Sequence, residues 1–144
     1  MREILFRGKN NDGDWVYGYI NQHRGDSILD CKCEQINGDD FYIYDYAAKI
    51  DTGIYGLLYK IIPETVGQYT GLTDKNGVKI FEGDIVERID SEQAVISWIK
   101  YSACFGLSFD GWCCGFDDYD FSPNDFKVIG NIHDKPELLK TLSP

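Results

Sequence analysis

The sequence predicts a mostly β protein: short antiparallel strands, a small SH3-like barrel in the second half of the chain, and a short C-terminal helix. Three observations lead to this fold class. Aromatic residues, which favour strands, make up 15% of the chain. Fifteen glycines against four prolines indicate many tight turns. Apolar and polar residues also alternate over short runs, as they do in strands that bury one face. A chain of 144 residues suits one compact unit.

The central stretch, residues 64–89, shows this pattern most clearly. It alternates over three short runs that are separated by two turn sequences. Asn76-Gly77 lies in the first turn and Gly83-Asp84 in the second, and both pairs accept the positive φ that tight turns require. We therefore expect three strands joined by two structural turns. Gly83 should bend the chain sharply, while Asp84 bonds to the backbone of its own turn.

The N-terminal region, residues 1–62, predicts β-hairpins packed on the rest of the chain. Strands at 3–8 and 15–20 flank a turn at residues 10–13. Alternation puts Trp15, Tyr17 and Tyr19 on one face of the second strand, and Val16 and Ile20 on the other. Two apolar faces mean either that both are buried or that one is reserved for a neighbour.

A second hairpin is expected from residues 28–33 and 41–46, across a turn at 37–40. Residues 53–62 are ambiguous: the apolar spacing of three and four suits a short helix, but Gly56 and Tyr59 weaken that interpretation. Pro63 ends the segment in either case.

Residues 63–144 predict the barrel-type domain. Further strands are expected at 94–101, 105–109, 112–116 and 127–133, with a hairpin turn at Asp110-Gly111. Strands this short close most easily as a small barrel, which also removes exposed edges. A helix should run from Asp134 through Leu142, with Asp134 and Glu137 capping its first turn.

Three segments resemble the YopX-like proteins of phages and prophages. The first is Arg7-Gly8-Lys9 with the Trp15-Val16-x-Gly18 step. The second runs from Gln68 to Gly77 and on through Ile80 to Val86, and the third extends from Val128 to Leu139. Residues from about 23 to 57 show little resemblance, so we treat them as a variable part. The resemblance implies a phage or prophage origin, and it brings no biochemical activity with it.

The charge of the chain narrows the possible partners. Its net charge is −10, from 24 acidic and 14 basic residues. Direct nucleic-acid binding is therefore not expected, because affinity for phosphate backbones comes mainly from Lys and Arg. An acidic protein that imitates nucleic acid and inhibits a host enzyme stays open as an alternative. A charged N-terminus and the lack of an apolar run of about 20 residues argue against secretion and membrane insertion. An odd number of thiols then indicates a reducing bacterial cytoplasm.

The sequence offers little support for a metal or a cofactor, and we expect neither. The thiols are Cys31, Cys33, Cys104, Cys113 and Cys114, and none of them forms the Cys-x-x-Cys pair usual in zinc sites. Buried, reduced, structural thiols are the alternative that we favour. The acid-rich stretch 115–125 could bind calcium through Asp117, Asp118, Asp120, Asn124 and Asp125. It lacks the glycine and the closing glutamate of a calcium loop, so a solvated loop is the better interpretation.

Catalysis is not indicated either. A Cys–His pair would have to combine Cys104 or Cys113 with His133 or His23, and no third residue that would orient the base can be identified. The central glycines lack the Lys-Ser/Thr of a phosphate loop. We predict a non-enzymatic module and keep an enzyme of unassigned class as an alternative.

Aromatic residues are the remaining candidates for function. Their number exceeds what so small a core should need, and aromatics are enriched at interfaces. Packing between two sheets is the structural alternative. We select as candidate interface residues Trp15, Tyr17, Tyr19, Tyr69, Trp98 and Trp112. The sequence thus predicts an accessory protein that binds another macromolecule, a host or phage protein, or that assembles as a homo-oligomer.

Overall fold

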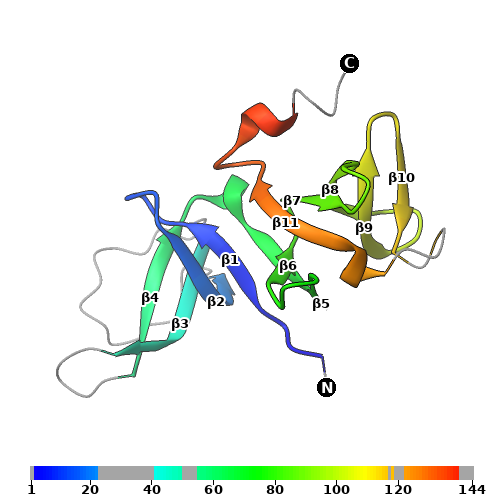
Figure 1. The fold of residues 1–144 in the computed structure, drawn as a ribbon. Coiled ribbons are helices and arrows are strands. Elements are labelled where there is room, and N and C mark those ends of the chain that lie inside the picture. The colour runs from blue at the N-terminus through cyan, green and yellow to red at the C-terminus, as the bar shows by residue number, and fades with distance from the viewer. Residues whose placement is uncertain (1, 23–40, 50–54, 117, 119–121, 140–144) are drawn as a thin grey trace. The chain divides into compact units, whose positions relative to one another are not determined.

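The computed structural model describes residues 2–22, 41–49, 55–116, 118 and 122–139 (Figure 1). The chain divides into two compact units. The N-terminal unit is Ile4–Gln68, and the C-terminal unit is Tyr69–Pro144 together with Met1–Glu3. Both are built from antiparallel strands, so the predicted β class is confirmed.

The N-terminal unit is a sheet of successive hairpins. Its strands are β1 (Phe6–Lys9), β2 (Trp15–Gln22), β3 (Phe41–Lys49), β4 (Tyr55–Ile61) and the start of β5 (Gly67–Thr73), with the 3₁₀ turn η1 (Pro63–Thr65) before β5. They pair in the order β4-β3-β2-β1-β5. The ambiguous segment 53–62 is thus a strand where it is described, because its backbone pairs with β3 from Phe41↔Ile61 to Lys49↔Tyr55. The predicted strand 28–33 and turn 37–40 lie outside the described residues.

One face of β2 forms the core of the N-terminal unit. Val16 packs with Ile43 and Ile61, all of them buried. At Gly18 the backbone of β2 lies so close to that of the paired strand β3 that a Cβ atom would be 2.0 Å from the carbonyl oxygen of Tyr44, so only glycine fits. Tyr17 and Tyr19, on the other face, are 44% and 48% exposed. The predicted division of faces is correct, and the aromatic face remains open to solvent at these two residues.

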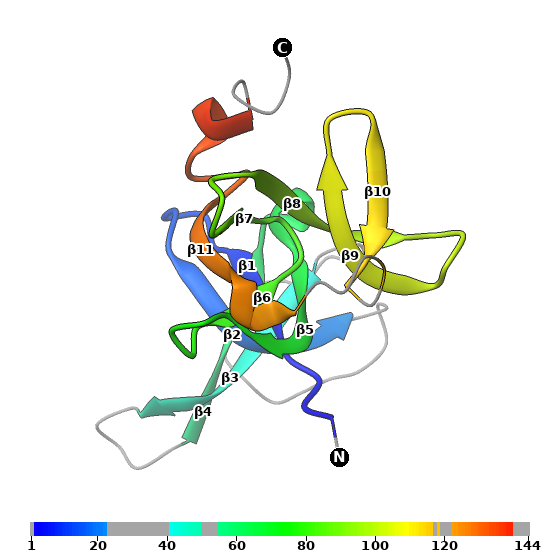
Figure 2. The ribbon, with the colours of Figure 1, turned by 45° about the vertical axis from the view of Figure 1, so that its right-hand side comes forward.

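The C-terminal unit contains a second sheet. After β5 come β6 (Lys79–Phe81), β7 (Asp84–Arg88), β8 (Gln93–Ile99), β9 (Cys104–Phe109), β10 (Trp112–Gly115) and β11 (Phe126–Asn131). Strand β6 pairs with β5, while the other five form a sheet in the order β10-β9-β8-β7-β11 (Figure 2). The predicted three strands and two turns of the central stretch are all present. The core contains Ile80, Val86, Ala94, Ile96, Leu107, Cys114, Phe116 and Phe126.

The predicted closed barrel is wrong. In the described part of the chain β10 pairs only with β9 and β11 only with β7, so the five-stranded sheet is open at both edges. Short strands and tight turns are necessary for a barrel, but closure also requires the edge strands to meet. Here β11 lies against β7 with a register shift between Val128 and Gly130, and β10 folds back along β9.

The predicted C-terminal helix is also wrong over the described residues. Only a 3₁₀ turn, η4 (Pro136–Leu138), follows β11, and residues 140–144 lie outside the described part. Asp134 does not cap this turn, because its carboxylate accepts a hydrogen bond from the Asn131 side chain at 2.9 Å. Lys135 occupies the capping position instead, and no side chain caps the turn there.

The first central turn is organised by a buried carboxylate. Asp74 is only 3% exposed, and one of its carboxylate oxygens accepts the backbone N–H groups of Asn76 and Val78 at 2.8 and 2.9 Å. The other oxygen accepts the N–H of Val128 in β11, also at 2.9 Å. Burial raises the pKa of Asp74, but the three N–H donors and nearby Lys127 lower it more, so the pKa lies below its usual value.

The second turn joins β6 to β7 through Gly83 and Asp84. Gly83 has a φ of 85°, in the region that favours glycine. Its N–H donates to the carbonyl of Ile96, and its own carbonyl accepts from Ile132 at 2.9 Å. The Asp84 carboxylate accepts the N–H of Phe81 at 2.7 Å. Both roles predicted for this turn are therefore confirmed.

We predict that Asp74→Asn destabilises the protein by about 2–3 kcal/mol at neutral pH. The amide of Asn has one acceptor oxygen where the carboxylate has two, and it lacks the negative charge to which the three backbone N–H groups donate in the native protein. Since the folded pKa is depressed, the carboxylate stabilises the fold above its unfolded pKa, near 3.8, and this contribution is lost as pH falls through the lower folded value. The measurement is urea unfolding across a pH series. Exposed Asp110→Asn is the control. A difference between Asp74→Asn and the native chain that persists unchanged below both pKa values would contradict this account.

We also predict that Gly83→Val destabilises the fold by more than about 1–2 kcal/mol, because a β-branched residue is strained at this φ. A Cβ atom at Gly83 would meet Ile132 at an ordinary 3.6 Å, so the cost is conformational and not steric. Gly83→Asn is the matched variant, since Asn tolerates this region, and should cost less. Equal melting temperatures for the two variants would show that φ does not set the cost.

Candidate functional site

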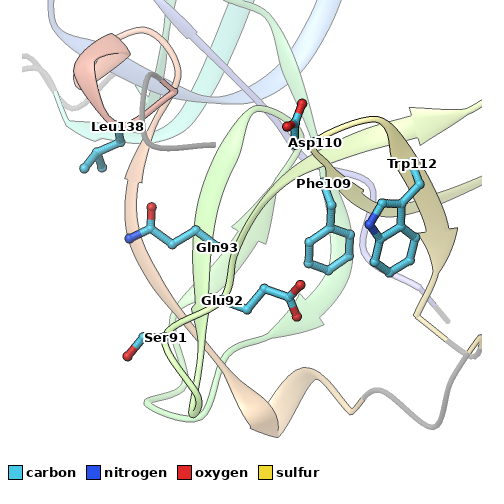
Figure 3. Close-up of a pocket in the computed structure, with 7 residues that line it drawn as sticks. All are labelled: Ser91, Glu92, Gln93, Phe109, Asp110, Trp112 and Leu138. Carbon is cyan, nitrogen blue, oxygen red and sulfur yellow. The ribbon is translucent and has the colours of Figure 1, made fainter. Parts of the chain in front are cut away.

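A cavity in the C-terminal unit lies beside the β9–β10 hairpin (Figure 3). Its volume is about 550 Å³. The lining comes from the β7–β8 turn, the β9–β10 hairpin and η4, and consists of Ser91, Glu92, Gln93, Phe109, Asp110, Trp112 and Leu138. We call this cavity the hairpin pocket.

An aromatic pair forms one wall of the hairpin pocket. Phe109 ends β9 and Trp112 begins β10, and the two residues face each other across the Asp110-Gly111 turn. Their rings stack with centroids 4.3 Å apart and planes 12° apart, as Figure 3 shows. Phe109 also packs against the hydrophobic core, while Trp112 is 44% exposed. The pair is thus a flat aromatic surface that is supported from below and open above.

The charged side chains in the described lining of the hairpin pocket are all acidic. Its described lining contains the carboxylates of Glu92 and Asp110 but no Lys, Arg or His. In Figure 3 the Glu92 carboxylate points toward the Phe109 ring. Glu92 also forms an ion pair with Arg88 at 3.6 Å, and Arg88 binds Asp90 as well. Aromatic faces and carboxylates both attract cations, so the chemistry of this pocket suits a cationic group.

The six predicted interface residues are divided between the two units, three in each. Trp112 lies in the hairpin pocket, whereas Trp98, 46% exposed, packs edge-on against Phe105 at 5.0 Å. Tyr69 is only 6% exposed and packs against Phe81 at 5.5 Å. Its ring is part of the interior, so we do not include it in any proposed surface.

The other three predicted residues belong to the N-terminal unit. Trp15, Tyr17 and Tyr19 lie in a row on one face of β2, as alternation predicts. The Arg7 guanidinium lies 4.7 Å from the centroid of Trp15, and the Lys9 ammonium lies 5.4 Å from it. These cation–π contacts come from β1, whose Arg7 and Lys9 stand opposite Tyr17 and Trp15.

Of the seven residues that line the hairpin pocket, sequence reasoning selected Trp112 and missed the other six: Ser91, Glu92, Gln93, Phe109, Asp110 and Leu138. The sequence does contain a pattern that predicts the position of Phe109 beside Trp112. A two-residue turn at Asp110-Gly111 sets the residues on either side of it directly opposite each other, which places Phe109 against Trp112. Glu92 and Leu138 come from other parts of the unit, and no local pattern brings them to this hairpin.

The described thiols, Cys104, Cys113 and Cys114, are free. Burial raises the pKa of the Cys114 thiol, and the nearby Asp118 carboxylate raises it further. The Tyr101 hydroxyl donates to the carbonyl oxygen of Cys113 at 3.1 Å. Cys31 and Cys33 lie outside the described residues, so the prediction of structural thiols is answered only in part.

The other site predictions concern metals and catalysis. Asp125 takes part in a capping box, with its carboxylate accepting the Ser122 N–H at 3.0 Å, whereas Asp117, Asp120 and His23 are not described. Where the structure describes the chain, no three His, Cys, Asp or Glu side chains gather as metal ligands would. No described helix has the length and apolar character needed to cross a membrane.

The fold of this chain is similar to that of a solved protein. The crystal structure of protein EF1440 from Enterococcus faecalis is similar, with a TM-score of 0.51 and 22% sequence identity. The similarity covers 96% of this chain and 99% of that one, and at this identity it shows a shared fold alone. No curated protein sequence matches the chain. The family model described as "YopX protein" matches residues 5–140, nearly the whole chain, so the protein belongs to the YopX family.

Proposed function

We propose that this YopX-family chain is a non-enzymatic accessory protein of a phage or prophage, and that it acts in the bacterial cytoplasm by binding another protein. In this proposal a Lys or Arg side chain of the partner enters the hairpin pocket. The observation that carries it is the stacked pair Phe109 and Trp112 beside the carboxylates of Glu92 and Asp110.

The stacked pair supplies the contact surface. A guanidinium or ammonium over Trp is attracted by the negative face of the ring, by about 0.5–2 kcal/mol depending on how far it is removed from water. Arg gains more than Lys, because its planar group also stacks on the ring and can bind a carboxylate through two hydrogen bonds. Phe109 holds Trp112 in place from the core side, so little side-chain entropy is lost on binding.

The charge and the volume of the hairpin pocket both suit a Lys or Arg side chain of the partner. The carboxylates of Glu92 and Asp110 lie on the same cavity as the ring pair, so a bound cation can contact both kinds of group. The net charge of −10 attracts a basic segment over a longer range and increases its rate of encounter. A cavity of about 550 Å³ accommodates one long side chain and part of its flanking backbone.

The alternatives fit this pocket less well. A nucleic-acid mimic needs carboxylates spaced like phosphates along an exposed face, whereas these two carboxylates line one cavity together with two aromatic rings. An enzyme of the Cys–His type needs a nucleophile beside a base, and the described lining contains no Cys or His. Neither alternative uses the ring pair.

We predict that an arginine-rich peptide binds the native protein and that Trp112→Ala weakens this binding about tenfold, because the cation loses its aromatic surface. Asp110→Asn and Glu92→Gln should each weaken it severalfold and reduce its salt dependence. The measurement is isothermal titration calorimetry at several salt concentrations. A glutamate-rich peptide is the ligand control, and Trp98→Ala, an exposed Trp of the same sheet outside the pocket, is the variant control. Equal affinities for native, Trp112→Ala and Trp98→Ala proteins would refute this function.

Self-association is a second expectation that follows from the open sheet. Strands β10 and β11 have free edges in the described sheet, and Tyr101 is 76% exposed. We predict a homo-oligomer that becomes more stable as salt rises toward physiological levels, because salt screens the repulsion between subunits of charge −10. Light scattering across a salt series tests this. A monomer of 16.5 kDa at every salt concentration would end the proposal of self-association.

A further inference from the structure

The outward face of the N-terminal sheet has a composition unlike that of the whole chain. Strand register places side chains from four strands on this face: Arg7 and Lys9 from β1, Trp15, Tyr17 and Tyr19 from β2, Tyr42 and Tyr44 from β3, and Leu58 and Lys60 from β4. We call it the β1–β4 face. Its paired positions contain three cations and five aromatic rings, while Asp14 and Asp45 line a cavity together with Trp15 and Tyr17.

The register shows how these side chains share one face. Arg7 stands opposite Tyr17, and Tyr19 opposite Tyr44. Residues directly opposite in antiparallel strands project to the same side, and so do residues two apart in one strand. The aromatic side chains therefore form rows across two strands, β2 and β3, with cations on either side in β1 and β4.

Some side chains of this face are buried, and others are accessible to solvent. Arg7 and Tyr42 are buried, whereas Tyr17, Tyr19 and Lys60 are exposed. The guanidinium of Arg7 and the ammonium of Lys9 both lie over the ring of Trp15, so two cations contact this ring. The other side of β2 packs into the core through Val16, so the exposed tyrosines stand on a rigid strand.

The net charge of the chain does not describe this face. Whole-chain charge made direct nucleic-acid binding unexpected, but charges act over a Debye length of about 8 Å at physiological salt. Within that distance the local arrangement decides the sign of the potential. Among the described residues, Arg7, Lys9 and Lys60 outnumber the carboxylates of Asp14 and Asp45 that lie beside Trp15 and Tyr17, so this face favours an anion although the chain as a whole is acidic.

We propose that the β1–β4 face binds single-stranded nucleic acid. Tyr17 and Tyr19 would stack with successive bases, and Lys9 and Lys60 would contact the phosphates. Side chains two residues apart in a strand are separated by about 6.8 Å, so neighbouring tyrosines offer separate positions for neighbouring bases. Sheet faces that combine exposed aromatic rings with cations bind single strands in this way, with little dependence on sequence.

Double-stranded nucleic acid fits this surface poorly. Bases in a duplex already stack on one another, and their faces are not available to Tyr17 or Tyr19. Two lysines alone give only weak, salt-sensitive affinity for phosphates. This proposal is independent of the hairpin pocket, which lies in the other unit and has the opposite charge.

The test uses the full-length protein and fluorescently labelled oligothymidine and oligouridine of about 12 nucleotides, a length within the usual site sizes. Fluorescence anisotropy across a salt series should show binding to both single strands and much weaker binding to a duplex of the same length. Tyr17→Ala and Tyr19→Ala should each raise Kd roughly tenfold, whereas Tyr17→Phe should leave it nearly unchanged, because Phe retains the ring. Lys60→Gln should reduce the slope of log K against log salt by about 0.7.

Trp112→Ala, a change in the hairpin pocket, is the matched control and should not alter these affinities. Circular dichroism shows whether each variant is folded, and the Phe variant keeps the test valid if an Ala variant is not. The proposal is wrong if neither single strand binds, if the duplex binds as tightly as the single strands, or if Tyr17→Phe and Tyr17→Ala bind alike. Loss of arginine-peptide binding in Trp112→Ala, with oligonucleotide binding unchanged, would show that the two sites are separate.

Discussion

The buried carboxylate of Asp74 is the constraint on which the C-terminal unit depends. A charge at 3% exposure is costly unless hydrogen bonds replace its water, and here three backbone N–H groups do so. Two of these donors belong to the turn that begins at Asp74, and the third belongs to Val128 in β11. The N–H of Lys75 also donates to the carbonyl of Phe126. One side chain thus shapes a turn and holds the last strand against it.

The second turn extends this arrangement across the sheet. Gly83 bonds to Ile96 in β8 and to Ile132 just after β11, and β11 pairs with β7. The sheet is therefore fixed at β7, β8 and β11, and the β9–β10 hairpin continues from it with Phe109 packed on the core. This rigid base supports the aromatic pair of the hairpin pocket. The N-terminal unit does the same for its tyrosines, through Val16 on the opposite face of β2. In each unit, exposed aromatic side chains thus project from a strand that also packs against the hydrophobic core of that unit.

Local features were predictable from the sequence because they depend on neighbouring residues. Turns at Gly77, Gly83 and Gly111 require positive φ, and alternation along β2 assigned Val16 and Tyr17 to opposite faces. Features that depend on distant residues were not predictable from the sequence. Nothing near Tyr69 indicates that its ring is buried against Phe81. Barrel closure failed for the same reason, since it depends on whether two edge strands meet. The acidic character of the hairpin pocket also arises from separate segments, with Glu92 and Asp110 in different turns.

The most direct test of this account is amide hydrogen exchange, measured by NMR in the native protein and in Asp74→Asn. If one carboxylate joins the turn to β11, the N–H groups of Asn76, Val78 and Val128 should lose protection together, although Val128 is 54 residues from Asp74 in sequence. The N–H of Val16, in the other unit, should keep its protection as a reference. Faster exchange at Asn76 and Val78 with Val128 unchanged would contradict the account, because Asp74 would then shape its own turn without holding β11.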